Sequence, residues 1–169
     1  MLRFAIILLI LSPTFATACQ AQEKPIREAL AGRVVSITDG DTLRLLTYGD
    51  GLEPRQVVIR LEGIDAPEKG QPFGGKSKDR LGELVHDRQV IVGVTGTDRY
   101  GRTLGKVYLH GDGERKEANL ILTQDGLAWH YTQFNREPHY AAAQAEAMRE
   151  KRGLWAEANP VAPWEWRRK

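Results

Sequence analysis

The sequence predicts an α+β protein built on a five-stranded β-barrel of the OB type with about three helices. Two observations favour this fold: short alternating or apolar segments separated by turn residues, and one helical segment placed between the third and fourth of five such strands. The 169 residues include 17 glycines and 8 prolines, which fits a chain with many turns. The length suits one well-buried domain, and 41% hydrophobic with 27% charged residues is typical of a folded protein.

Residues 1–21 have the pattern of a secretory signal peptide. Arg3 precedes an apolar run at residues 4–11, and Ala16-Thr17-Ala18 provides the small residues of a cleavage site. The run is too short to cross a bilayer, so we expect no stable membrane span and an exported protein, periplasmic or secreted. Cys19 follows the cleavage site. We expect simple cleavage there, and the alternative is a lipid anchor on Cys19. Either way the mature domain has no disulfide.

The first half of the mature domain is predicted to form a three-stranded meander. Residues 22–31 are polar and are predicted to lead into the domain, which covers residues 32–169. Strands are expected at residues 32–37, 42–46 and 56–64. Asp39-Gly40 between the first two indicates a tight hairpin turn.

The second half alternates between strands and helices. The expected elements are a helix at 76–87, strands at 89–95 and 104–110, a short helix at 117–123 and a last helix at about 138–152. Gly126 and Gly153 stand where glycines end helices. The tail after Gly153 contains Trp155, Trp164 and Trp166, which we expect to pack against the domain.

Four charged clusters stand out along this framework. They are Asp39-Gly40-Asp41-Thr42, Arg60, Asp65-Ala66-Pro67-Glu68 and Asp98-Arg99-Tyr100-Gly101-Arg102. A meander brings the start of its second strand and the end of its third to one barrel edge, so the carboxylates of Asp41 and Asp65 are expected to meet there. Two carboxylates with backbone carbonyls and water form a hard oxygen site that suits calcium or magnesium.

The arginines of these clusters suit a phosphate. A guanidinium is always charged and presents a planar fork of donors to an oxyanion. A cation and two arginines would stabilise charge on the phosphorus oxygens, and the remaining carboxylate, Glu68, would activate or orient a water. The combination indicates phosphodiester hydrolysis.

These motifs, in this order and with these separations, resemble the staphylococcal nuclease family, and Gly126-Leu127-Ala128 extends the likeness to roughly residues 32–155. The resemblance implies an OB-fold endonuclease with one calcium ion that cuts DNA and RNA at the 5′ P–O bond and leaves 3′-phosphate ends. It places calcium on Asp41, Asp65 and the backbone carbonyl of Ala66. Glu68 would be the general base, and Arg60 and Arg102 would bind the scissile phosphate.

Further substrate contacts are expected from the neighbourhood of these motifs. Arg99 and Tyr100 belong to the same motif as Arg102, and Lys76 and Lys78 follow the third cluster, so these four side chains are predicted to contact the nucleic acid. Thr132 and Phe134 fall near the positions where the best-known family members have tyrosines beside the bound nucleotide.

Three other interpretations fit the sequence less well. Residues 70–77 satisfy a phosphate-loop pattern, but the strands are not the continuous apolar runs that a parallel phosphate-loop domain requires. A non-catalytic OB module that binds nucleic acid is the main alternative. The three acids disfavour it, because carboxylates repel phosphate. An EF-hand calcium loop that begins at Asp39 is also disfavoured. Leu43 stands where an oxygen ligand is required, and Asp50 stands where the loop requires a glutamate. We expect a monomer.

Overall fold

The computed structural model describes residues 23–48, 53–110 and 116–168. The predicted signal peptide and Cys19 lie outside these residues, as does most of the turn expected between the second and third strands. Among the described residues, no helix is long and apolar enough to cross a membrane.

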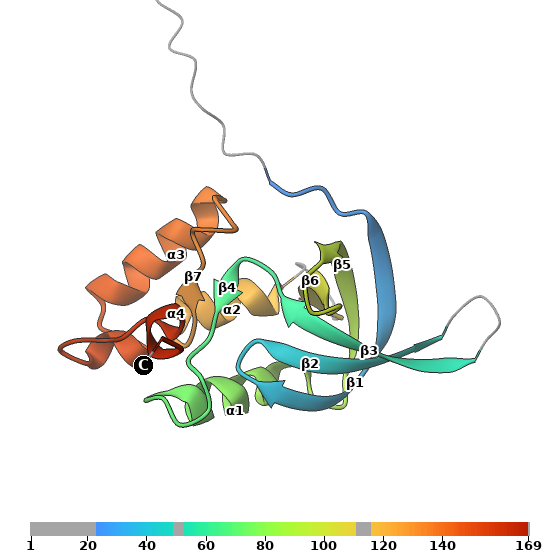
Figure 1. Cartoon of the computed structure of the whole chain (residues 1–169), viewed down its shortest axis with the longest axis horizontal. Coiled ribbons are helices and arrows are strands. Elements are labelled where there is room, and N and C mark those ends of the chain that lie inside the picture. Colours follow the sequence, from blue (N-terminus) through green and yellow to red (C-terminus); the bar gives the residue numbers. More distant parts are fainter. Residues whose placement is uncertain (1–22, 49–52, 111–115, 169) are drawn as a thin grey trace, which may run out of the picture.

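A closed five-stranded barrel forms the body of the protein, which confirms the OB-type prediction (Figure 1). Its strands are β1 (Glu28–Asp39), β2 (Thr42–Tyr48), β3 (Pro54–Leu61), β5 (Gln89–Thr97) and β6 (Thr103–Leu109). They follow the order β1-β2-β3-β6-β5, and β5 pairs back to β1. All neighbours are antiparallel except β3 and β6, which run parallel.

Strand β1 is longer than predicted because it serves both of its neighbours. Its first half, from Glu28 to Arg33, pairs with β5, and its second half, from Gly32 to Asp39, pairs with β2. Residues 28–31 therefore belong to the barrel and not to the lead-in segment at 22–31. This part of the strand is held by its backbone pairing with β5, which no local sequence pattern indicates.

The helices gather on one side of the barrel, together with a two-stranded ribbon of β4 (Ile64–Asp65) and β7 (Trp129–His130) (Figure 1). They are α1 (Gly74–Val85), α2 (Ala118–Gln124), α3 (Pro138–Arg149) and α4 (Pro163–Trp166), with a 3-10 turn η1 (Gly153–Ala156) between the last two. The short α4 adds to the three predicted helices.

Helix α2 ends as predicted, whereas α3 ends earlier. After α2, Gly126 has φ of 67° and donates its N–H to Thr123 O, and Leu127 donates to Leu122 O, which is a Schellman motif. After α3 the left-handed residue is Lys151, with φ of 52°, and Arg152 donates its N–H to Ala147 O. The helix therefore stops at Arg149, and Gly153 is not its cap.

The core fills the barrel and the space under the helices. Inward side chains of β2, β3, β5 and β6 have no solvent exposure, among them Leu43, Leu45, Ile59, Val92 and Val107. Leu81 and Val85 of α1 and Leu122 of α2 extend the same apolar cluster. Burial of this kind supplies the main driving force for a fold without disulfides.

One buried amide links α2 to the barrel. Asn119 accepts the N–H of Val107 at 3.0 Å and donates to the carbonyl oxygens of Glu62 at 2.9 Å and Gly105 at 3.1 Å. The side chain has no solvent exposure, so water cannot replace these bonds. Asn119 thus fixes the backbone just after β3, immediately before the ribbon strand β4.

We therefore expect Asn119→Ala to lower the free energy of unfolding by about 2–3 kcal/mol, because buried backbone groups lose their partners. Chemical denaturation of both proteins measures this difference. Asn159 is exposed, so Asn159→Ala serves as the control and should leave the midpoint nearly unchanged. An Asn119→Ala protein as stable as the control would show that the amide is not the link described.

Candidate active site

A cleft of about 750 Å³ opens at the edge of the barrel. The predicted catalytic and metal-binding residues all line it, as do Arg99 and Tyr100, whereas Lys76, Lys78 and Thr132 do not. Its charged and aromatic lining comes from seven parts of the chain. They are the segment before β1, the β1–β2 turn, the end of β3, the segment from β4 to α1, the β5–β6 loop, the residues after β7 and the C-terminal tail. These side chains are Lys24, Asp39, Asp41, Arg60, Glu62, Asp65, Glu68, Asp98, Arg99, Tyr100, Arg102, Tyr131, Phe134 and Arg167.

The hairpin turn between β1 and β2 presents Asp41 to this cleft. Gly40 packs so closely that a β-carbon there would lie 2.0 Å from the hydroxyl oxygen of Ser77 and 2.7 Å from the β-carbon of Ala66. The carboxylate of Asp41 accepts the backbone N–H of Ala66 at 2.7 Å and the hydroxyl of Thr42 at 3.1 Å. The turn is thereby fixed to α1 and to the segment after β4.

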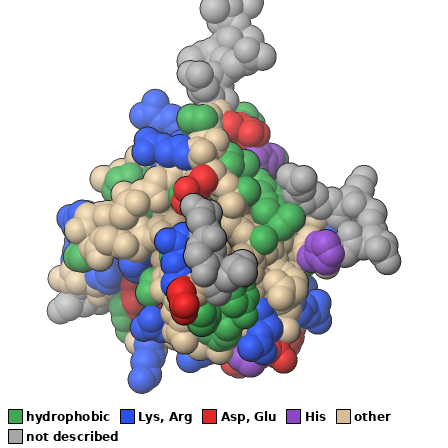
Figure 2. Space-filling view, turned by 90° about the vertical axis from the view of Figure 1, so that its right-hand side faces the viewer, with side chains coloured by type: hydrophobic (Ala, Val, Ile, Leu, Met, Phe, Trp, Pro, Cys, Tyr) green, Lys and Arg blue, Asp and Glu red, His purple; other side chains and the backbone are tan. Residues whose placement is uncertain are grey.

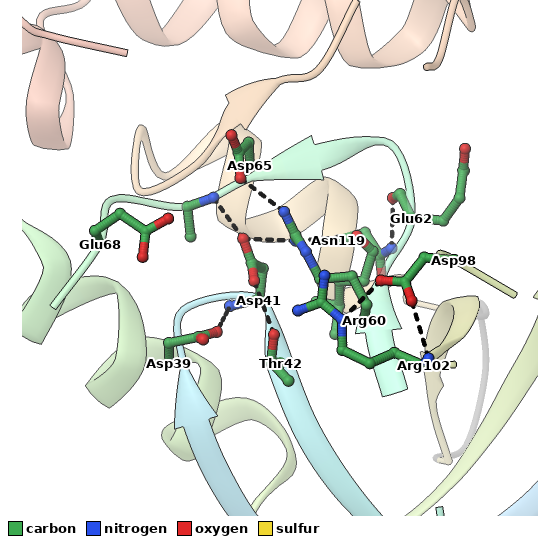
Figure 3. Close-up of polar contacts among 12 residues, drawn as sticks. Asp39, Asp41, Thr42, Arg60, Glu62, Asp65, Glu68, Asp98, Arg102 and Asn119 are labelled. Carbon is green, nitrogen blue, oxygen red and sulfur yellow. Dashed lines mark hydrogen bonds and ion pairs between the residues drawn. The ribbon is translucent and has the colours of Figure 1, made fainter. Parts of the chain in front are cut away.

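Arg60, at the end of β3, bridges two buried carboxylates (Figure 3). Its Nη1 lies 2.6 Å from Asp41 Oδ2, and its Nη2 lies 2.7 Å from Asp65 Oδ1. The exposed fractions of the three side chains are 11%, 7% and 2% in the order Arg60, Asp41, Asp65, so little water screens the pairs. The predicted meeting of Asp41 and Asp65 at one edge is observed.

The cluster carries more negative than positive charge. Burial raises the pKa of Asp41 to about 7; Arg60 opposes this shift, and the nearby charges of Asp39 and Asp65 add to it. A carboxyl group in this state gains from any additional cation. Two carboxylates and adjacent backbone oxygens are the donors that a hard divalent ion prefers, so the residues present fit calcium.

A second acidic group lies elsewhere among the described residues. Ligand atoms of Glu23, Glu137 and His139 lie within 4.8 Å of one another. Glu137, however, is buried and paired with Lys106 Nζ at 2.6 Å, and it also accepts a bond from Asn135. One of the two carboxylates of this group is therefore already paired with a lysine.

The loop between β5 and β6 holds Arg102 at the cleft. Asp98 accepts the backbone N–H groups of Tyr100 and Arg102, both at 2.9 Å, and the Nε of Arg102 at 2.7 Å. Partial burial disfavours the charged form of Asp98, but these bonds outweigh burial and lower its pKa. The ion pair uses Nε and does not occupy the terminal nitrogens of Arg102. Tyr100 is 69% exposed, and the guanidinium of Arg99 lies 4.8 Å from its ring centroid.

Glu68 lies on the segment between β4 and α1, on the same side as the Asp41 and Asp65 pair (Figure 3). Its backbone N–H donates to Gln71 Oε1 at 3.0 Å. Its carboxylate pairs with Arg167, which the sequence did not suggest as a site residue. A basic residue near three tryptophans in a tail has no local pattern that separates it from a solvated arginine.

Lys76 and Lys78 are exposed on α1 and do not line the cleft. The ammonium group of Lys76 instead lies 4.5 Å from the ring centroid of Phe73. Their substrate contacts stay a prediction without support from this geometry. Tyr131 and Phe134 do line the cleft, with ring centroids 4.8 Å apart, whereas Thr132 does not.

Comparison with known proteins agrees with this arrangement. The family described as staphylococcal nuclease homologue matches residues 58–157. A Haemophilus influenzae protein named uncharacterized endonuclease is 42% identical over 160 residues, covering 95% of this chain and 82% of that protein. An Escherichia coli protein of the same name is 44% identical over 136 residues, covering 80% and 84%. The micrococcal nuclease of Shigella flexneri is 40% identical over 145 residues, covering 81% and 80%. With its barrel, its cleft and these relatives, the chain belongs to the staphylococcal nuclease family.

Proposed function

We propose that this nuclease-family chain is a calcium-dependent endonuclease that hydrolyses phosphodiester bonds of DNA and RNA and leaves 3′-phosphate ends. One observation carries the proposal: a buried acid pair bridged by Arg60, a partly exposed carboxylate, Glu68, and a second arginine, Arg102, all line the same cleft. The names of the relatives, endonuclease and micrococcal nuclease, support nuclease activity.

Asp41, Asp65 and the carbonyl of Ala66 would hold the calcium ion. When bound, calcium would supply positive charge at the phosphate and so favour the transition state. The residues of the chain do the rest. Glu68 accepts a proton from the attacking water as the water oxygen bonds to phosphorus, and Arg60 and Arg102 stabilise the charge that grows on the phosphoryl oxygens. The bond between phosphorus and the 5′ oxygen breaks, and the 5′ oxygen takes a proton from solvent and leaves as a hydroxyl group.

The guanidinium groups of Arg60 and Arg102 are preorganised in the protein without substrate. Arg60 is held by two carboxylates, and Arg102 is held by Asp98. Because their positions are fixed, little reorganisation is needed when the phosphate becomes more negative. Arg99, Tyr100, Tyr131 and Phe134 border the same cleft and are the side chains placed to contact the neighbouring nucleotides.

A non-catalytic OB module is the second candidate. It would rely on a basic groove with stacking aromatic rings. On the face shown in Figure 2, lysine and arginine side chains lie in several separate places with acidic side chains among them. The cleft itself contains Asp39, Asp41, Asp65 and Glu68, whose charges oppose phosphate binding unless a cation joins them. This balance favours the nuclease.

We further propose that the protein is exported and acts as a monomer. The pattern of residues 1–21 supports export to the periplasm or the medium, with the lipid anchor on Cys19 as the alternative. Mass spectrometry of the protein from its native host would identify the mature N-terminus and any lipid, and size-exclusion chromatography with light scattering would give the oligomeric state.

The role of the cleft residues is tested by Glu68→Gln and Arg102→Ala. We expect each to lower kcat by roughly 10²–10³-fold with thermal unfolding little changed, because these groups act mainly in the transition state. Cleavage of a fluorescent oligonucleotide measures the rate. Glu157→Gln and Arg149→Ala, both exposed and outside the cleft lining, are the controls. Near-native rates in both cleft variants would disprove the assigned roles.

Calcium binding is tested through stability. A ligand present at about 100 times its Kd stabilises the folded state by about 2.7 kcal/mol, so calcium should raise Tm measurably. Asp41→Asn should abolish this rise, whereas His139→Gln should preserve it, because His139 does not line the cleft that holds the proposed calcium ligands. A rise that survives in Asp41→Asn and disappears in His139→Gln would move the calcium site to Glu23, Glu137 and His139.

A further inference from the structure

The C-terminal segment after η1 returns to the cleft and inserts one arginine between two of the proposed site acids. Arg167 Nη2 lies 2.8 Å from Asp65 Oδ2, and its Nη1 lies 3.3 Å from Asp65 Oδ1 and 2.5 Å from Glu68 Oε1. The family match covers residues 58–157, so this arginine lies outside the matched region.

We propose that Arg167 is a positioning residue for the nuclease reaction, acting by holding the carboxylate of Glu68 in place. The inference rests on the function proposed above, in which Glu68 accepts the proton of the attacking water. A planar guanidinium can bind two carboxylates at once through separate nitrogens, which a lysine ammonium does with less geometric definition.

The tail that carries Arg167 is firmly attached to the domain. Ala162 and Pro163 are buried, and the carbonyl of Val161 accepts the side-chain amide of Gln71 at 2.7 Å. Trp164 stacks on Tyr131 with ring centroids 5.2 Å apart and an interplanar angle of 2°, and its edge contacts Trp129. The short helix α4 then places Arg167 one residue beyond its end, where its N–H donates to Pro163 O.

Gln71 connects the tail to Glu68 directly. Its Oε1 accepts the backbone N–H of Glu68, while its Nε2 donates to Val161 of the tail. The backbone of Glu68 and the segment that delivers Arg167 are therefore fixed to the same side chain. Gln71 thus fixes the position of Arg167 relative to the backbone of Glu68.

Glu68 has more need of such a partner than the other proposed catalytic groups. Asp41, Asp65 and Arg60 hold one another in a buried cluster, and Arg102 is held by Asp98. The Glu68 side chain is 35% exposed, and among the described residues its carboxylate contact is with Arg167. A flexible carboxylate that must meet a water at one position loses rate when it is not oriented.

Removal of Arg167 should therefore act on Glu68 more than on Asp65. Asp65 keeps its pair with Arg60 at 2.7 Å when Arg167 is absent, whereas the carboxylate of Glu68 loses its partner. The Arg167 side chain is 43% exposed, so its loss should cost little stability.

The test uses Arg167→Ala and Arg167→Lys in the mature chain, with Arg168→Ala as a control that removes the same charge from an exposed neighbour. We expect Arg167→Ala to lower kcat on an oligonucleotide roughly 10- to 100-fold with KM and Tm nearly unchanged. Arg167→Lys should recover part of kcat because an ammonium still attracts Glu68, and Arg168→Ala should match wild type.

A double-mutant cycle shows whether Arg167 acts through Glu68. Added to Glu68→Gln, the Arg167→Ala change should lower kcat no further, because its target is already lost. Multiplying effects, or an Arg167→Ala protein with wild-type kcat, would overturn the proposal and leave the nuclease assignment intact. An active Glu68→Gln enzyme would instead overturn the proposed function itself.

Calcium titration by calorimetry distinguishes two roles of Arg167: positioning the carboxylate of Glu68, or competing with calcium for Asp65. If Arg167 merely occupied the place of a cation on Asp65, Arg167→Ala would bind calcium more tightly and cut faster at low calcium. We expect neither change. Tighter calcium binding together with a higher rate would show an inhibitory contact and overturn the positioning role.

Discussion

The guanidinium of Arg60 between Asp41 and Asp65 is the interaction on which the geometry of the site depends. It joins the hairpin turn after β1, the end of β3 and the ribbon strand β4 at one point, and all three side chains are almost completely buried. Loss of one member would leave a buried charge without its partner, which typically costs about 3–5 kcal/mol. Its two carboxylates share the one guanidinium of Arg60, and burial is the main cause that raises the pKa of Asp41. One arrangement therefore holds the strand ends together and places carboxylate oxygens at the cleft.

The surrounding loops are oriented by bonds that end on this cluster or near it. Ala66 donates its N–H to Asp41, and Gly40 leaves no space between the hairpin turn, Ser77 and Ala66. On the opposite side, Asn119 fixes the backbone at Glu62 and Gly105, so the segment that leads from β3 into β4 cannot drift away from the barrel. Strand ends and hydrogen-bonded turns therefore form much of the cleft lining.

The sequence predicts the barrel well because its signals are local. Alternating residues, the Asp-Gly turn and the helix between the third and fourth strands need only a few neighbouring positions to be recognised. Asp41, Arg60 and Asp65 also lie close together in the chain, so a simple meander brings them into contact. The early start of β1 escaped prediction because its pairing with β5 is a long-range backbone interaction. The early end of α3 escaped because Lys151, a residue that rarely adopts positive φ, closes the helix.

Arg167 shows more clearly what cannot be predicted from the sequence. It contacts Glu68 across 99 positions and Asp65 across 102, and tertiary contacts of the tail, such as Trp164 on Tyr131 and Trp129, determine that approach. Lys76 and Lys78 show the opposite case: they follow the Glu68 segment closely in the chain, yet α1 directs them to the exposed surface away from the cleft. Proximity in sequence is a poor guide once a helix intervenes.

The late position of the tail also separates the barrel from the completed cleft along the chain. The last barrel strand ends at Leu109, so all five strands, together with Asp41, Arg60 and Asp65, precede the segment that contains Trp164 and Arg167. A chain shortened before Trp164 would therefore contain every strand of the barrel and the acid pair, and it would lack the side chain that pairs with Glu68.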